Sequence, residues 1–282
     1  MNLENTIKKA SLILKRNNIP SYELDAQIIL SNIIGVNREF LITNNKTNIS
    51  SPNKDKYEAA IKRRTNGEPI AYITGQKEFW SLDFLVNNST LVPSPETEIL
   101  LYKLINFYKN KNISILDVGT GSGCIMLSLL KELKGSKGVG IDISSKAIQI
   151  AKLNAKKLNL NLRSKFMVSN ISKFNASKFD LIVSNPPYIP RKDIKNLSRD
   201  IINFEPKSAL DGGVDGLDLI KKVIYKSNYL LKRKGLLSLE IGYHQYHRVS
   251  GILKTQGYRE MHKEYDYNRN IRCIISTKLW FF

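Results

Sequence analysis

Apolar residues recur at helical spacing through the first 75 residues of the chain. Ile7, Ala10 and Leu14 lie on one face of a predicted helix, and Gly35 is placed to end a second one. Pro20-Ser21 begins this second helix, and Ser51-Pro52 begins another. No group of residues with catalytic chemistry occurs here. We therefore expect residues 1–75 to form a small helical bundle that docks the substrate.

The pattern changes to the shorter period of strands over residues 76–92. Phe79, Leu82 and Phe84 lie in this stretch, which ends near the turn-prone Asn87-Asn88. We expect a β-hairpin that links the helical bundle to a second domain over residues 93–282.

From residue 112 onward, apolar strands alternate with amphipathic helices, which is typical of a mostly parallel sheet with helices on both faces. A helix over residues 97–108 precedes this alternation and carries acids in its first turn. The predicted strands cover residues 113–118, 139–141, 166–168, 179–184, 235–241, 258–263 and 271–277. The last two are expected to be an antiparallel edge pair. The fold class is therefore α/β, with seven strands.

A stiff corner follows the strand at residues 179–184. Pro186 and Pro187 end the strand because neither has an N–H to donate, and Pro186 also biases Asn185 away from helical backbone angles. The corner presents one amide and the ring of Tyr188. A planar NH₂ group of a substrate could donate one hydrogen to Asn185 Oδ1 and the other to the Pro186 carbonyl.

A glycine-rich loop follows the first predicted strand of the sheet. Its glycines allow the backbone to approach a ligand closely, and Asp142 at the end of the next strand suits two ribose hydroxyls. The loop reads Gly119, Thr120, Gly121, Ser122 and Gly123. This Gly-x-Gly-x-Gly spacing differs from the dinucleotide pattern, and Asp117 before it suits an ammonium better than a pyrophosphate. Both details favour S-adenosylmethionine over a dinucleotide.

Composition narrows the function only slightly. The net charge is +19, which favours nucleic acid, a ribonucleoprotein or an acidic protein as partner. The basic residues are spread along the chain, however, as a codon bias toward Lys, Asn and Ile would also produce. Cys124 and Cys273 are too few for a disulfide framework and suit no zinc site, so no metal is expected. No apolar run approaches the roughly 18 residues of a membrane span, and a cytoplasmic location is expected.

The motifs together resemble one known family over nearly the whole chain. Asn-Pro-Pro-Tyr after a fourth strand is shared by class I methyltransferases that act on planar NH₂ groups. The fuller set resembles the peptide chain release factor glutamine methyltransferases (the HemK family). The matching motifs lie at residues 67–79, 92–98, 117–123, 185–189, 204–216, 240–242 and 257–258.

The resemblance implies a Rossmann-like class I fold and methyl transfer from S-adenosylmethionine to the glutamine nitrogen of a Gly-Gly-Gln motif in class I release factors. It implies catalytic roles for Asn185, Pro186 and Tyr188. The implied substrate-binding residues are Asn185, Pro186, Pro187, Tyr188 and Glu205. The implied cofactor-binding residues are Asp117, Gly119, Thr120, Gly121, Ser122, Gly123, Asp142, Asn170 and Asn185. A monomer that needs neither nucleic acid nor a membrane is expected.

The chain departs from the family pattern at a few positions. Ser94 stands where the family usually carries Arg, and Ser81 where it usually has Gly. Ser169-Asn170 replaces the Asp and the apolar or aromatic residue that normally border the adenine. Asn170 retains hydrogen-bonding capacity toward adenine, but the stacking partner is lost.

Three other functions fit parts of the sequence. An N6-adenine nucleic-acid methyltransferase would use the same corner and the +19 charge, although residues 1–75 show no basic-aromatic nucleic-acid motif. A methyltransferase for a ribosomal-protein glutamine shares the catalytic corner. A non-enzymatic RNA-binding module could keep a nucleoside-binding fold, but it would not need the Asn185 corner.

Overall fold

The computed structural model describes residues 1–266 and 268–279. Two compact units can be distinguished within it. Unit 1 comprises Met1–Gln76 and Ser198–Phe204. Unit 2 comprises Lys77–Leu197 and the described residues from Glu205 onward. The last three residues of the domain expected over 93–282 lie outside the described residues.

Unit 1 is helical, as the periodicity predicts. Its helices are α1 (Leu3–Arg16), α2 (Tyr22–Ile34), α3 (Arg38–Thr43), α4 (Ser51–Thr65), α5 (Ile70–Thr74) and α9 (Arg199–Phe204). Gly35 ends α2 with a φ of 72°, the left-handed conformation that glycine adopts without a Cβ penalty. Apolar faces of α1, α2 and α4 meet in one core around Leu14, Leu30 and Tyr57. No pattern in the sequence indicated that α9, far along the chain, would belong to this unit.

The hairpin is present, but its turn lies earlier than Asn87-Asn88. Strands β1 (Gln76–Phe79) and β2 (Leu82–Leu85) pair around Trp80 and Ser81. Both turn residues have a φ of 53°. Positive φ at both central residues is what a tight type I′ turn requires, and glycine is the residue that adopts it most easily. The periodicity missed this turn because neither residue is one that usually adopts positive φ.

All seven strands predicted for the sheet are confirmed. They are β3 (Ser114–Val118), β4 (Lys137–Asp142), β5 (Ser164–Val168), β6 (Phe179–Ser184), β7 (Leu231–Glu240), β8 (Tyr258–Tyr265) and β9 (Ile271–Lys278). Their order is β5-β4-β3-β6-β7-β9-β8. The pairs from β5 to β7 are parallel, whereas β9 is antiparallel to both β7 and β8. The sheet is therefore mostly parallel with an antiparallel edge.

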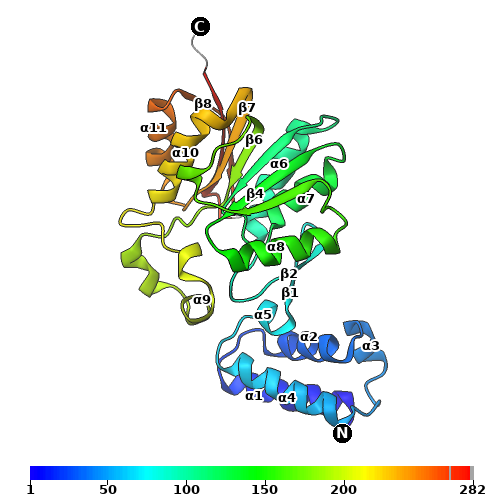
Figure 1. The fold of residues 1–282 in the computed structure, drawn as a ribbon. Helices are drawn as coiled ribbons and strands as arrows, with labels where there is room; N and C mark the ends of the chain where they lie inside the picture. Colours follow the sequence, from blue (N-terminus) through cyan, green and yellow to red (C-terminus); the bar gives the residue numbers. More distant parts are fainter. Residues whose placement is uncertain (267, 280–282) are drawn as a thin grey trace. The chain divides into compact units, whose positions relative to one another are not determined.

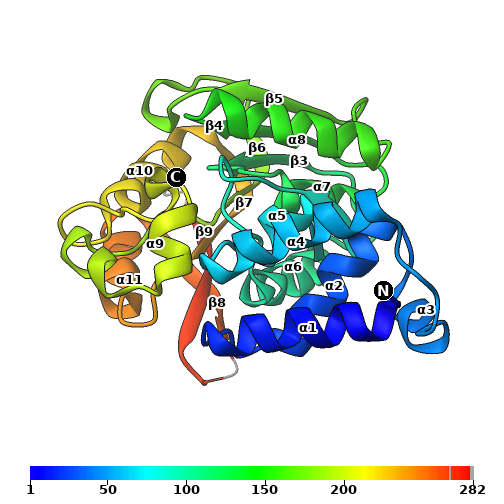
Figure 2. The same cartoon turned by 90° about the horizontal axis from the view of Figure 1, so that it is seen from below.

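Alternating side chains of each central strand face two separate cores. Ile115 and Leu181 point into the core beneath α6 (Pro95–Tyr108), α7 (Cys124–Glu132) and α8 (Ser145–Lys157). Leu116 and Ile182, one residue farther along, point into the core beneath α10 (Asp218–Leu230) and α11 (Tyr246–Thr255). Figures 1 and 2 show the two helical layers on opposite faces of the sheet. Since strands buried on both faces need apolar residues throughout, the continuous apolar runs in the sequence are explained.

The strand order reverses between β3 and β6. From β3 the chain moves outward through β4 to β5, then returns to the other side of β3 as β6. The register pairs Val118 with Ser184, so the loops that leave these two strands start side by side. Such a topological switch point is where open α/β sheets bind their ligands. No helix within the described ranges is long and apolar enough to cross a membrane.

Candidate active site at the switch point of the sheet

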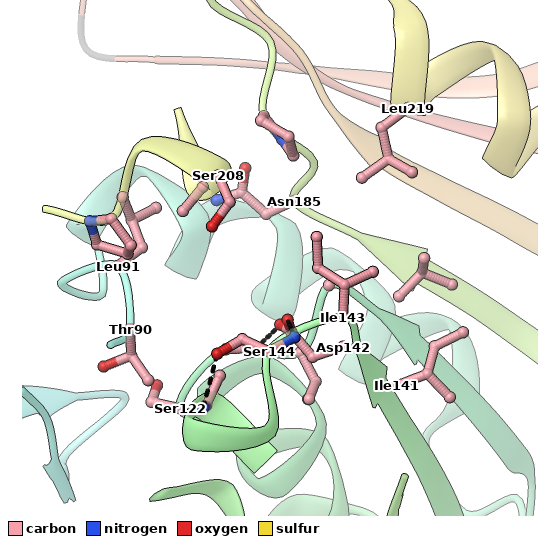
Figure 3. A pocket seen from close by; sticks show the side chains of 18 of the residues that line it. Thr90, Leu91, Ser122, Ile141, Asp142, Ile143, Ser144, Asn185, Ser208 and Leu219 are labelled. Atoms are coloured by element: carbon pink, nitrogen blue, oxygen red, sulfur yellow. Dashed lines mark hydrogen bonds between the residues drawn. The ribbon is translucent and has the colours of Figure 1, made fainter. Parts of the chain in front are cut away.

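A cavity of about 330 Å³ opens at the carboxyl ends of β3, β4 and β6, within unit 2. Its walls are the glycine loop after β3, the end of β4, the corner after β6, the segment at residues 89–94 and the loop at residues 206–213. Figure 3 shows Asp142 and Asn185 on different sides of this cavity. We call it the switch-point cavity.

The glycine loop lines one wall with exposed backbone. Gly119 and Gly121 have φ values of 73° and 54°, and a Cβ added to either would meet no atom within 4 Å. A side chain at these positions would therefore occupy the space that a ligand needs. Gly123 has a different role, because a Cβ there would lie 3.1–3.3 Å from Leu127, Phe166 and Ala151. It allows α7 to pack closely against its neighbours.

Asp142 stands at the end of β4 with its carboxylate fixed by backbone. Oδ2 accepts from the Gly121 N–H at 3.0 Å. Oδ1 accepts from the N–H of Ser144 at 2.9 Å, and Figure 3 shows Asp142 and Ser144 together. Each oxygen keeps a second lone pair. The carboxylate is thus held rigidly and can still accept from two neighbouring hydroxyl groups, as a ribose offers.

Asp117 lies behind the glycine loop and is not among the residues that line the cavity. It is fully buried, and its Oδ2 accepts from the Thr120 hydroxyl at 2.6 Å. Oδ1 has no partner of hydrogen-bonding geometry among the described residues. Burial raises the pKa of Asp117 to about 7, although Thr120 and the Met126 N–H both act to lower it. A buried carboxylate with an unpaired oxygen next to the loop fits a nearby cationic ligand.

The far side of the cavity is formed by Ile143, Ser169 and Asn170. Asn170 precedes the short helix η1 (Ile171–Lys173) and caps it, with Oδ1 accepting from the Ser172 N–H at 2.9 Å. No described residue accepts from its amide NH₂. That group remains available to a ring nitrogen of a ligand.

The corner after β6 contributes Asn185 and Pro187 to the cavity. Asn185 Nδ2 donates to Thr97 Oγ1 at 3.2 Å, and Thr97 Oγ1 donates to Glu240 Oε2 at 2.7 Å. No described residue donates to Asn185 Oδ1 or to the Pro186 carbonyl. Pro186 itself is buried and does not line the cavity. The corner therefore carries two carbonyl oxygens with no protein donor.

Tyr188 lies outside the cavity lining, and its contacts are with the protein. Its hydroxyl accepts from an Arg272 nitrogen at 2.8 Å, and the Arg272 guanidinium lies 5.2 Å from the centre of its ring. Its carbonyl accepts from Gln245 Nε2 at 2.8 Å. Burial raises the pKa of Tyr188 to about 12. These contacts brace the corner from behind.

The polar mouth of the cavity is formed by two paired segments, the corner after β6 and the loop at residues 206–213. The Ile189 N–H donates to the Leu210 carbonyl and the Gly212 N–H donates to the Ile189 carbonyl, which joins the corner to the loop. Arg191 and Asp211 form an ion pair at 2.9 Å, and both line the cavity. Glu205 does not line it, whereas its neighbour Pro206 does.

The structure thus brings the predicted residues Gly119 to Ser122, Asp142, Asn170, Asn185 and Pro187 to one cavity. Pro186, Tyr188, Asp117 and Gly123 lie next to it without lining it. The site prediction omitted Thr97, which lines the cavity, and it gave no role to Arg272. A buried threonine beside acids in the first turn of α6 was a weak signal, because such residues normally only cap or stabilise a helix.

The chain is similar to known proteins over nearly its whole length. The family model of the PrmC N-terminal domain matches residues 5–75, and a model of a methyltransferase domain matches residues 109–243. The chain is 40% identical to the release factor glutamine methyltransferase of Buchnera aphidicola subsp. Schizaphis graminum, covering 99% of this chain and 100% of the relative. It is 36% identical to the protein of that name from Clostridium acetobutylicum, covering 99% of each. The hMettl16 catalytic domain has a similar fold, with a TM-score of 0.56, 18% identity and coverage of 85% of each chain.

Proposed function

Because the chain belongs to the release factor glutamine methyltransferase family, we propose that the switch-point cavity holds S-adenosylmethionine and the acceptor glutamine side by side. The enzyme transfers a methyl group from S-adenosylmethionine to a glutamine side chain of a release factor. The proposed acceptor is the side-chain nitrogen of the glutamine in the Gly-Gly-Gln motif of class I release factors. The observation that carries the assignment is the pair of carbonyl oxygens at Asn185 and Pro186, to which no described residue donates, beside the cavity of about 330 Å³.

The residues around the cavity fit the cofactor. Asp142 would hold the ribose hydroxyls, and the Asn170 amide would reach the adenine. The open glycine loop at Gly119 and Gly121 would accommodate the amino-acid portion, with Asp117 buried behind it. Thr120, Ser122 and Gly123 shape this loop. When bound, S-adenosylmethionine supplies a methyl group already activated by a sulfonium.

Alignment of the acceptor nitrogen is the main task left to the protein. An amide nitrogen is a poor nucleophile because its lone pair is delocalised into the carbonyl. Asn185 Oδ1 and the Pro186 carbonyl would each accept one N–H of the glutamine, which fixes the plane of the amide. Orientation of this kind lowers barriers by up to roughly 7–11 kcal/mol in ideal cases. Both acceptors strengthen as the nitrogen gains positive charge, so they bind the transition state better than the ground state.

The remaining predicted residues would support the substrate. Pro187 lines the cavity beside Asn185, and Tyr188 braces the corner through Arg272. Glu205 and the polar mouth around Arg191 and Asp211 would contact the backbone on either side of the glutamine. Residues 1–75 would dock the body of the release factor, and residues 76–92 would link them to the catalytic domain at 93–282. The enzyme would act as a cytoplasmic monomer.

Peptide mapping of methylated products tests this function. Purified protein and S-adenosylmethionine are incubated separately with a class I release factor, ribosomal protein, RNA and DNA. We expect methylation only of the release-factor glutamine. The Asn185→Ala variant should lose methylation by at least about a thousandfold while it binds the cofactor normally. Methylation of adenine or of ribosomal protein instead would contradict the proposal, and near-normal activity of the variant would remove Asn185 from the mechanism.

A further inference from the structure

The amide of Asn185 is tied to the protein through its nitrogen. Nδ2 donates to Thr97 Oγ1 at 3.2 Å, and Thr97 in turn donates to Glu240 at 2.7 Å. Thr97 is 2% exposed and Glu240 is 1% exposed, so water does not compete with these bonds. We call Asn185, Thr97 and Glu240 the amide clamp. Its members come from α6, β7 and the corner after β6.

The number of protons in the amide clamp determines which way the Asn185 amide faces. An ionised carboxylate can only accept, so Thr97 must give its single hydroxyl proton to Glu240. Thr97 then has only lone pairs left for Asn185. Asn185 must turn its NH₂ toward Thr97, which leaves Oδ1 as the atom available in the cavity. The assignment comes from the bonding partners, because the two ends of an amide have nearly the same shape.

Arg272 on β9 supports the ionised form of Glu240. It lies 3.9 Å from Glu240 Oε1, and its own side chain is buried. Burial raises the pKa of Glu240 to about 7, with Glu96 of α6 acting in the same direction. Thr97, Arg272 and Asn185 act to lower it. Glu240 therefore changes its charge near neutral pH.

The other titratable groups that face Glu240 stay neutral at that pH. Burial raises the pKa of Cys124 on α7 to about 12, and that of Tyr188 at the corner also to about 12. The pKa of Cys273 on β9, the partner of Glu240 across the two strands, is raised well above its usual value by burial. The charge that acts on Glu240 therefore comes from Arg272 and Glu96.

We propose that Thr97 and Glu240 are positioning residues that fix Asn185 with its oxygen toward the substrate and so select a side chain that offers an NH₂ group. This rests on the proposed function, in which Asn185 receives the glutamine amide. Glutamine presents two N–H donors, which Oδ1 can accept. The carboxylate of glutamate has nearly the same shape but presents only acceptors, so Oδ1 repels it. The amide clamp thus separates glutamine from glutamate.

The amide clamp also makes turnover sensitive to acid. A proton on Glu240 Oε2 can be donated to Thr97, and the Thr97 hydroxyl proton is then free to point at Asn185 Oδ1. The Asn185 amide can turn over and present NH₂ to the NH₂ of glutamine, which is repulsive. Because Glu240 binds this proton below its pKa, kcat of the wild-type enzyme falls as the pH drops through about 7.

Two substitutions of Thr97 separate the hydroxyl from the shape of the side chain. Thr97→Val keeps the shape and loses the bonds, so we expect kcat on the release factor to fall at least about tenfold, the loss of one to two buried hydrogen bonds. Thr97→Ser keeps the hydroxyl and retains kcat within about threefold. Calorimetry should show the Kd for S-adenosylmethionine within about twofold in both. Thr277→Val is the matched control, because that hydroxyl on β9 donates to the Gly235 carbonyl, away from the cavity.

Glu240→Gln tests the direction of the hydrogen bonds in the amide clamp. A glutamine here turns its oxygen toward Arg272 and its NH₂ toward Thr97, which reverses the hydrogen bonds and favours a flipped Asn185. The probe is a release factor with glutamate in place of the acceptor glutamine, used as a competitive inhibitor. In the variant, binding of the glutamate protein relative to the glutamine protein should be at least about tenfold stronger than in the wild-type enzyme. The decline of kcat near pH 7 should also disappear, which a purely structural role of Glu240 would not cause.

Either of two results would overturn the proposal. One is a Thr97→Val enzyme with kcat like that of the wild type. The other is a Glu240→Gln enzyme with an unchanged preference between the two release factors and an unchanged pH profile. Failure of the proposed function looks different, because the wild-type enzyme with its intact clamp would then leave the release factor unmethylated.

Discussion

Each unit buries a carboxylate next to an arginine, and the two pairs differ in how completely they are bonded. In unit 1, Asp25 of α2 and Arg64 of α4 meet at 2.7 Å, with Asp25 only 4% exposed. In unit 2, Glu240 lies 3.9 Å from Arg272, whose guanidinium is shared with Glu96 and the Tyr188 hydroxyl. The first pair joins two helices. The second adjoins the cavity, and burial raises the pKa of its carboxyl group, Glu240, to about 7.

Unpaired buried atoms show the same contrast. Within the described residues, buried side-chain nitrogen and oxygen atoms without a hydrogen-bond partner all belong to unit 2. Asp117 Oδ1 and Arg272 Nε, both close to the site, are two of them. Incomplete pairing of buried polar atoms costs stability, and at Asp117 and Arg272 a ligand or a change of charge can use it. Unit 1 pairs its buried Asp25 carboxylate closely with Arg64, whereas unit 2 keeps incompletely paired groups next to the cavity.

The largest effect is expected from breaking the pair in unit 1. Asp25→Ala leaves the Arg64 charge buried without its partner and should destabilise unit 1 by about 3–5 kcal/mol. Hydrogen exchange of the α2 and α4 amides measures this loss directly. The double variant Asp25→Leu with Arg64→Met should recover most of the protection, because no charge is then left unpaired. Protection unchanged in Asp25→Ala would show that the pair does not hold the two helices.

A smaller effect, on binding, is expected from Asp142. Asp142→Ala removes the proposed ribose acceptor and should weaken S-adenosylmethionine binding by about 1.5–3 kcal/mol, which calorimetric titration would show as a tenfold to hundredfold higher Kd. Unfolding should be affected less than in Asp25→Ala, because Asp142 is half-buried and water can reach the freed N–H groups. Asp142→Asn keeps one acceptor oxygen and should fall between. An unchanged Kd in the alanine variant would place the ribose elsewhere.

The smallest effect should come from the hairpin turn of unit 2. Ser81 has a φ of 53°, where a Cβ is unfavourable by roughly 1–2 kcal/mol, and it is exposed. Ser81→Gly relieves this strain but raises the conformational entropy of the unfolded chain. We therefore expect the free energy of unfolding to rise by a net amount of about 0.5–1 kcal/mol. Thermal unfolding measures it, with Ser81→Ala as the control that keeps a Cβ and should show no gain. A loss of stability in the glycine variant would mean that the Ser81 side chain contributes contacts of its own.

Local features of the sequence predicted much of unit 2 because their physics is local. A strand buried on both faces needs a continuous apolar run, and the runs at residues 113–118 and 179–184 became the buried central strands β3 and β6. Asp142 and Asn185 could be placed in one site because parallel strands end at the same edge of a sheet. The turn at Trp80-Ser81 escaped this reasoning, since its positive φ values are imposed by the pairing of β1 with β2 and not by residues that prefer them.

The sequence by itself determined the helical first region, the strands, the glycine loop and the proline corner, since each depends on backbone angles and on neighbours close along the chain. Only the tertiary structure decided which side chains control Asn185. Thr97 precedes Asn185 by 88 positions, and Glu240 follows Thr97 by 143. Their meeting depends on the position of β7 beside β6 and on the packing of α6 across the sheet. Hydrogen bonds between such distant residues leave no periodic trace, because a single residue at each end is enough to form them.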